Sequence, residues 1–88
     1  MKIVRYIEEF NNSNDKLNNE YILDITPEKI LEVLQDFKLN NDDYPNEIYD
    51  SYLLTILQLN RLKPFLKDKL EENILKYSYY LSAYEDNR

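Results

Sequence analysis

The sequence predicts an α+β fold, in which a small antiparallel sheet of about three strands is covered on one face by two helices. Strand-like alternation lies near both ends of the chain, two helix-start signals lie between, and polar turn formers separate these segments. The chain has 88 residues, of which 43% are apolar. This length fits one domain, residues 1–88, whose modest core buries roughly 60–65% of the surface of the unfolded chain.

A β-hairpin is predicted first. Residues 3–10 mix β-branched, aromatic and charged side chains, and residues 11–15 are Asn, Ser and Asp, which favour turns. In the next segment apolar residues recur at every second position, as in a strand with one buried face. These positions are Leu17, Asn19, Tyr21, Leu23 and Ile25, with Asn19 as the one polar member.

Two helices are predicted between the strands. The first begins at Thr26-Pro27-Glu28, where Thr caps free amides, Pro fits the first helical position and Glu suits the positive end of the helix dipole. Its apolar stripe runs from Ile30 to Phe37. The second helix begins at Thr55, which forms a capping box with Gln58, and Pro64 is expected to kink or split it.

A third strand is predicted over Ile74–Leu81, which gives the element order β-β-α-α-β. Tyr80 and Tyr84 fall on the face of this strand that we expect to be exposed. The residues that alternate onto the opposite, packed face are Leu75, Tyr77, Tyr79 and Leu81.

The absence of three particular residue types excludes most enzyme classes. The sequence contains no Cys, no His and no Gly. It therefore has no disulfide, thiol nucleophile, His-containing zinc site, imidazole base, Walker A loop or dinucleotide-binding fingerprint. We predict a protein that is not an enzyme, with no catalytic residues, cofactor or metal. Left-handed turn positions should fall to Asn and Asp.

The chain is acidic, with a formal net charge of -6. This charge repels nucleic acids and anionic membranes and favours cationic partners, although it also serves simply to keep a small protein soluble. No apolar run has the length of a signal peptide or a membrane-spanning helix. We therefore expect a cytoplasmic protein that binds neither membrane nor nucleic acid.

The segment from Asn40 to Ser51 combines carboxylates and tyrosines with little apolar periodicity, and is predicted to be a surface loop. A short strand near Tyr49 to Leu53 is compatible with the pattern but not defined by it. A solvated loop and a docking site for a basic partner explain the carboxylates about equally well, and Tyr is a common interface anchor. The candidate partner-binding residues are Asp42, Asp43, Tyr44, Glu47, Tyr49, Asp50, Tyr52, Tyr80 and Tyr84.

Four segments carry a resemblance to a known family: Ile3–Phe10, Tyr21–Leu23, Ile48–Tyr52 and Lys76–Leu81. Their pattern resembles that of small bacterial proteins of otherwise unassigned function that include immunity proteins of contact-dependent growth inhibition systems. The resemblance implies a protein made beside a secreted toxin, which binds the toxin's C-terminal domain in the cytoplasm and blocks its active site or substrate surface. Toxins of this kind are often basic nucleases, which an acidic, Tyr-rich surface would complement.

Two other functions stay open from the residues alone. One is a different acidic binding module, such as a phage-encoded inhibitor that mimics the charge of nucleic acid. The other is a subunit of a homo-oligomer. A neighbouring toxin gene would favour the immunity protein, a phage genomic setting the inhibitor, and a concentration-dependent mass in solution the oligomer.

Overall fold

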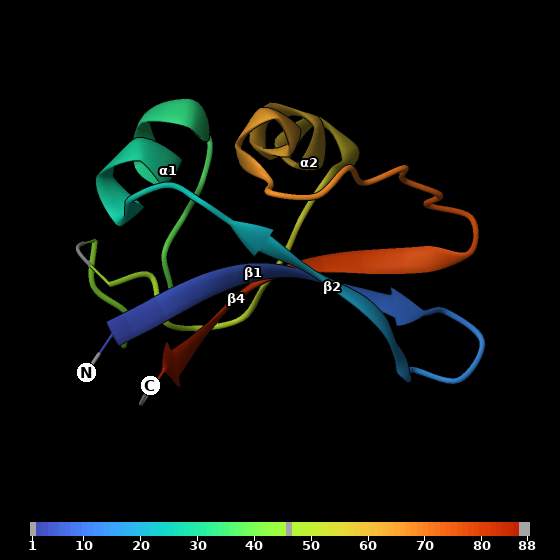
Figure 1. The fold of residues 1–88 in the computed structure, drawn as a ribbon. Coiled ribbons are helices and arrows are strands. Elements are labelled where there is room, and N and C mark those ends of the chain that lie inside the picture. Colours follow the sequence, from blue (N-terminus) through green and yellow to red (C-terminus); the bar gives the residue numbers. More distant parts are fainter. Residues whose placement is uncertain (1, 46, 87–88) are drawn as a thin grey trace.

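A four-stranded antiparallel sheet with the strand order β2-β1-β4-β3 forms one layer of the fold (Figure 1). The computed structural model describes residues 2–45 and 47–86. The α+β class is confirmed, and the sheet has one strand more than expected because a two-residue strand joins its edge. The strands are β1 (Lys2–Asn11), β2 (Leu17–Leu23), β3 (Tyr52–Leu53) and β4 (Tyr77–Asp86).

The two central strands, β1 and β4, are far apart in the sequence. They pair along their whole length, from Lys2 opposite Asp86 to Asn11 opposite Tyr77. The predicted hairpin then joins β1 to β2. Its turn contains Asp15 at φ 58°, so the expected use of Asp in a left-handed position is confirmed there.

Helix α1 (Pro27–Val33) begins where predicted but ends earlier. The Thr26 hydroxyl caps its first turn. The predicted stripe extended to Phe37, whereas Leu34 already leaves helical geometry, with φ -103° and ψ 72°. Phe37 still packs against the core, because a turn after the helix brings its ring centroid to 4.8 Å from that of Tyr52.

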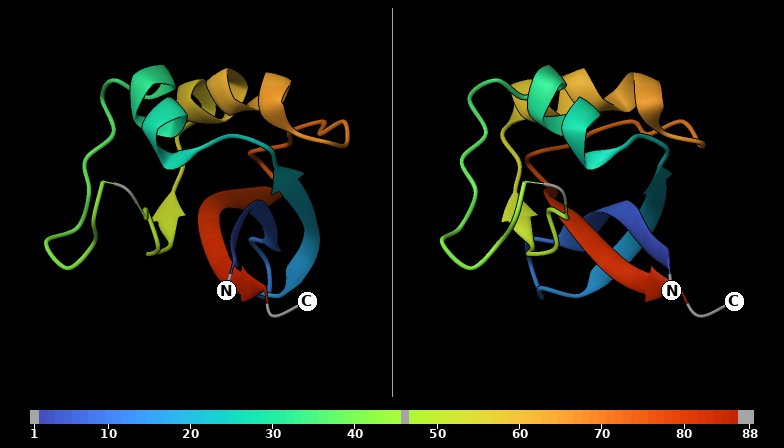
Figure 2. Two further views of the ribbon diagram at one scale, coloured as in Figure 1. Left: turned by 60° about the vertical axis from the view of Figure 1, so that its left-hand side comes forward. Right: turned by 90° about the vertical axis from the view of Figure 1, so that its left-hand side faces the viewer.

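Helix α2 (Ile56–Leu62) follows β3 directly. The predicted capping box is present, with hydrogen bonds in both directions between Thr55 and Gln58. Pro64 ends the α-helix as expected, and the chain continues as a short 3-10 helix, η1 (Lys63–Phe65). Both α-helices lie on the same face of the sheet, as Figures 1 and 2 show.

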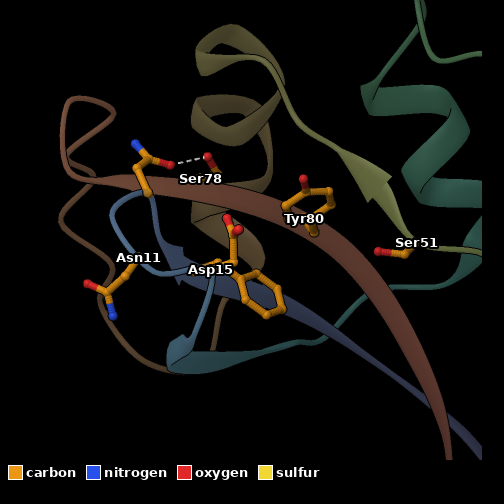
Figure 3. Close-up of a pocket in the computed structure, with 7 residues that line it drawn as sticks. Asn11, Asp15, Ser51, Ser78 and Tyr80 are labelled. Carbon is orange, nitrogen blue, oxygen red and sulfur yellow. Dashed lines mark hydrogen bonds between the residues drawn. The ribbon is translucent and has the colours of Figure 1, made fainter.

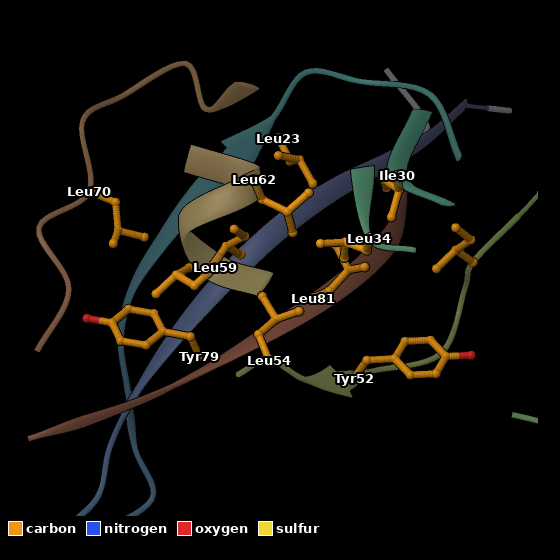
Figure 4. Close-up of a cluster of buried hydrophobic side chains, with 12 residues drawn as sticks. Leu23, Ile30, Leu34, Tyr52, Leu54, Leu59, Leu62, Leu70, Tyr79 and Leu81 are labelled. Carbon is orange, nitrogen blue, oxygen red and sulfur yellow. The ribbon is translucent and has the colours of Figure 1, made fainter. Parts of the chain in front are cut away.

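The hydrophobic core lies between the helices and the face of the sheet that they cover (Figure 4). Ile7 of β1 and Leu81 of β4 are directly opposite each other on this face, and both are completely buried. Tyr52 and Tyr79 lie at opposite ends of the cluster, with their hydroxyls pointing away from each other in Figure 4. The other fully buried side chains are Ile30, Leu34, Ile48, Leu59, Leu62 and Leu70.

Strand β4 begins later than the strand predicted from the sequence. The prediction started at Ile74 and placed Leu75 on the packed face, but the strand begins at Tyr77 and Leu75 is 92% exposed. Residues 74–76 form a turn instead, because the chain must reverse before it enters the sheet. Tyr79 is buried on the covered face, as expected.

A carboxylate is buried in the covered face at Glu9, which is 3% exposed. Its oxygens accept hydrogen bonds from the Tyr79 hydroxyl at 2.7 Å and the Asn18 amide at 2.8 Å. The Tyr79 hydroxyl in turn accepts a hydrogen bond from the backbone amide of Asn73 at 3.1 Å. Burial and the bond to Glu9 raise the pKa of Tyr79 well above its ordinary value. These bonds join β1, β2, β4 and the segment before β4.

Replacing Tyr79 by Phe should lower the free energy of unfolding by about 1–3 kcal/mol, because Glu9 would stay buried but lose a hydrogen-bond donor. Urea denaturation followed by circular dichroism measures this loss. The matched control is Tyr44→Phe, which removes the hydroxyl of a side chain that is 62% exposed and should leave the midpoint unchanged. Equal stability of Tyr79→Phe and the unmodified protein would show that these bonds do not support the fold.

Candidate functional site

The predicted surface loop, residues 40–51, connects the turn after α1 to β3, with Asn46 outside the described residues. We call residues 40–51 the acidic loop. Its green and yellow ribbon projects from the body of the molecule in Figure 2 before it returns to the sheet. The loop has almost no regular secondary structure, so its conformation depends on side-chain contacts.

Asp43 organises the acidic loop by accepting four hydrogen bonds. Its Oδ1 accepts from the backbone amides of Tyr44 and Tyr49, both at 2.8 Å. Its Oδ2 accepts from the amide of Asp50 at 3.1 Å and from the hydroxyl of Tyr52. Burial would raise the pKa of Asp43, but these hydrogen bonds together outweigh it and lower the pKa below the ordinary value. Asp43 is therefore ionised at neutral pH and holds the loop.

The hydroxyl of Tyr52 links the acidic loop to the core. It donates to Asp43 and accepts a hydrogen bond from the backbone amide of Asn40 at 3.1 Å. Burial and the hydrogen bond to Asp43 raise the pKa of Tyr52 to about 12, so the hydroxyl keeps its proton at neutral pH. Asn40 at the start of the loop and Asp43 within it are thus both tied to one tyrosine of the core.

Arg5 supports the acidic loop from β1. Its side chain is buried, and its guanidinium donates a hydrogen bond to the carbonyl oxygen of Glu47. Burial lowers the pKa of Arg5, although the carboxylates of Glu28, Asp43 and Glu47 act in the opposite direction. These carboxylates offset part of the cost of holding a cation inside the protein.

Ile48 gives the acidic loop a strained backbone. It is completely buried and has φ 47°, a left-handed conformation that is rare for β-branched residues. The expectation that Asn and Asp would fill such positions is wrong here. The core fixes the Ile48 side chain and Asp43 fixes the next amide, so the surroundings hold the residue in this conformation.

Five of the predicted contact residues remain available on the acidic loop. Tyr44 is 62% exposed and Tyr49 is 43% exposed. Asp42 is also exposed, and Glu47 and Asp50 are half-buried. The loop therefore presents two tyrosine rings and three carboxylates on one ordered segment.

Asp43 and Tyr52 require a correction, because both were predicted to contact a partner. Their side chains are buried, and their polar atoms bond to each other and to backbone amides of the loop. They position the exposed residues instead of forming a contact surface. The carboxylate-rich composition gave no means of separating a buried Asp from its exposed neighbours.

The carboxylates of Asp42 and Asp50 interact unfavourably. The side-chain amide of Asn40 donates to Asp50 at 3.2 Å, which works to lower the pKa of Asp50. Asp42, desolvation and Asp43 outweigh this bond and raise the pKa above its ordinary value. A cationic partner would relieve this repulsion.

Tyr80 and Tyr84, the other predicted contact residues, lie on the face of the sheet opposite the helices. We call this the uncovered face. Tyr84 is 44% exposed, and Tyr80 is partly buried. The strand register and the alternation of side chains define the face by Val4, Tyr6, Glu8, Phe10, Glu20, Ile22, Leu53, Ser78, Tyr80, Ser82 and Tyr84.

Tyr6, Glu8 and Phe10 also belong to this face, although they are not among the contact residues predicted from the sequence. Their spacing of two residues along β1 is the signal that could have identified them. A cavity of about 310 Å³ lies at the end of the face nearest the hairpin turn (Figure 3). Its lining includes Phe10, Tyr80, Asn11, Asp15, Ser51 and Ser78.

Metal binding and membrane insertion find no structural support in residues 2–45 and 47–86. In this part of the chain, no group of three or more carboxylates is placed to hold a metal ion. Its helices are too short to cross a bilayer. The exposed contact residues predicted from the sequence lie on the acidic loop and on the uncovered face.

Residues 4–82 match a family model described as Domain of unknown function (DUF7683). The chain belongs to this family. The DUF7683 match begins in β1 and ends in β4, so it includes the acidic loop, β2 and β3 completely and most of β1 and β4. Comparison with curated proteins and with solved structures finds no significant match.

The anchoring role of Asp43 predicts a pH dependence of stability. A carboxylate with a lowered folded pKa stabilises the fold above its unfolded pKa, and this contribution is lost as pH falls through the folded pKa. The free energy of unfolding should therefore fall between about pH 5 and pH 2 more steeply in the unmodified protein than in Asp43→Asn.

Urea denaturation at a series of pH values measures how the free energy of unfolding depends on pH in the unmodified protein and in Asp43→Asn. At pH 7, Asp43→Asn should cost about 2 kcal/mol, because an amide nitrogen would replace one acceptor oxygen among four donors. Asp68→Asn, at an exposed position, should follow the unmodified protein at every pH. Parallel profiles for Asp43→Asn and the unmodified protein would exclude Asp43 as the anchor.

Proposed function

We propose that this protein is an immunity protein, which binds and neutralises a basic bacterial toxin domain in the cytoplasm through the acidic loop. The proposal rests on one observation above all. A loop with exposed Tyr44 and Tyr49 and with carboxylates beside them is held in a fixed conformation by the buried Asp43. This arrangement suits a surface that recognises another protein.

The fixed conformation supports binding because ordering a flexible loop opposes association. Each mobile side chain that an interface immobilises costs about 0.5–1.5 kcal/mol, and a loop ordered beforehand avoids part of this cost. The Asp43 and Arg5 hydrogen bonds order the acidic loop without a partner. Tyr44 and Tyr49 then offer wide rings with few rotatable bonds, which are common anchors of interfaces.

The charge of the acidic loop favours a partner with a positively charged surface. The protein carries a net charge of -6, and Asp42 and Asp50 repel each other on the loop. A Lys or Arg placed between them would remove this repulsion and lower the pKa of Asp50. A basic toxin domain would be attracted over a distance by the net charge and held locally by these carboxylates.

Affinity purification and a growth assay test the proposed function together. The tagged protein is used as bait at low salt in an extract of the organism that encodes it, and co-purifying proteins are identified by mass spectrometry. We expect one basic protein in equimolar amount, which stops bacterial growth when expressed alone and not when co-expressed with this chain. A partner that is harmless alone, or a toxic partner that still kills in co-expression, would refute the proposal.

Charge-neutral variants locate the binding surface. Asp42→Asn with Asp50→Asn should weaken toxin binding about tenfold and reduce its salt dependence, because two partly exposed ion pairs are lost. The control, Asp68→Asn with Glu71→Gln, makes the same change of charge on another exposed segment and should alter affinity less than twofold. Asp43 is kept in both, since it holds the loop. Equal affinities of the two double variants would remove the acidic loop from the interface.

A further inference from the structure

The uncovered face of the sheet is aromatic, although no helix of the described structure covers it (Figures 1 and 2). In an antiparallel sheet with helices on one side, the other face is ordinarily polar and solvated. Here the rings of Tyr6 and Tyr84 lie 5.4 Å apart at 60°, and those of Phe10 and Tyr80 lie 5.5 Å apart at 90°. Four aromatic side chains arranged in two pairs indicate a surface adapted for contact.

A buried negative charge lies in the centre of this face. Glu8 is 6% exposed, and its oxygens accept hydrogen bonds from the hydroxyls of Ser82 and Tyr84. Among the side chains that the structure describes, no Lys or Arg forms a salt bridge with it. Glu8 also lies directly opposite Glu20 of β2, and like charges at directly opposed positions destabilise a sheet. Glu8 and Glu20 thus give this face negative charge without an ion pair among the described side chains.

The cavity beside Glu8 adds a third carboxylate. Tyr80, the partner of Glu8 on β4, forms part of its wall together with Phe10. Figure 3 shows Asp15, from the hairpin turn, and Ser51, from the end of the acidic loop, at the same cavity. Its volume of about 310 Å³ lies at the small end of ligand pockets, and none of its lining residues is basic.

We propose that the uncovered face is a receptor for an arginine side chain of a partner protein. The guanidinium enters the cavity, packs against the rings of Phe10 and Tyr80, and pairs with the carboxylate of Asp15. Glu8 and Glu20 supply further negative potential beside it. Arginine fits better than lysine because its planar, weakly hydrated group stacks on aromatic rings while its edge donates hydrogen bonds.

This site shares Ser51 with the acidic loop, and its other lining residues lie outside the loop. Ser51 ends the loop and lines the cavity, and its Oγ lies 3.3 Å from the Oγ of Ser82 on the uncovered face. One basic partner could therefore contact both surfaces. The inference does not depend on the partner being a toxin, because it concerns a single arginine side chain.

A small probe tests the site without any partner protein. N-acetyl-arginine amide is titrated into the 15N-labelled protein and followed by NMR, with N-acetyl-citrulline amide as the uncharged analogue of the same shape. We expect saturable shifts at amides near residues 8–15 and 78–82, and at least tenfold weaker binding of citrulline. Equally large chemical-shift changes at amides around Asp42 and Asp68 would mean that arginine binds exposed carboxylates without preference for the cavity. That result would overturn the proposal.

Two variants test the residues of the cavity. Asp15→Asn removes the charge, and Asn also tolerates the left-handed turn position, so the hairpin should remain intact. Tyr80→Leu removes the ring. Each should weaken arginine binding about fivefold, in line with an exposed ion pair or cation–π contact. Asp68→Asn should leave it unchanged.

Unchanged binding in both cavity variants would overturn the assignment. So would a preference of the cavity for citrulline, or for a neutral sugar such as glucose, over arginine. Either preference would show that the cavity recognises its ligand through hydrogen bonds and ring stacking and not through positive charge.

Discussion

Hydrogen bonds between buried tyrosine hydroxyls and carboxylates hold the irregular segments of this protein to its sheet. The arrangement occurs at both ends of the core, as Tyr79 with Glu9 and as Tyr52 with Asp43. In each case the same hydroxyl also accepts a hydrogen bond from a backbone amide, of Asn73 or of Asn40, in a segment without regular structure. A chain with no cysteine cannot fix such segments by disulfides, and polar anchors inside a small core take over this role.

These hydrogen bonds divide the tyrosines into buried ones that support the fold and exposed ones that face solvent. Tyr52 and Tyr79 are occupied by the fold, whereas Tyr44 and Tyr49 remain free to face solvent because the carboxylate of Asp43 fixes the backbone from which they project. Tyr84 belongs to a third pair, with Glu8, on the uncovered face. The same chemical pair therefore builds the core at two places and shapes an outer surface at the third.

Local rules explain what the sequence could predict. The hairpin, the start of α1 and the capping box of Thr55 depend on neighbouring residues, and all three were predicted. A short strand near Tyr49 to Leu53 was compatible with the sequence, but the bounds and pairing of β3 depend on β4. The left-handed Ile48 depends on the core, and no neighbouring residue predicts it. The burial of Asp43 likewise results from four donors that converge only in the folded chain, whereas in the sequence it resembles its exposed neighbour Asp42.

The central pairing of β1 with β4 affects how the protein can fold during synthesis. The hairpin of β1 and β2 can form early, but the other edge of β1 has to wait until residues 77–86 have left the ribosome. A long loop must then close before the covered face is complete, and such non-local pairing slows folding. Nascent chains would expose Ile7 and the rest of the unfilled core until translation of β4, so chaperones would have their main opportunity to bind within this interval.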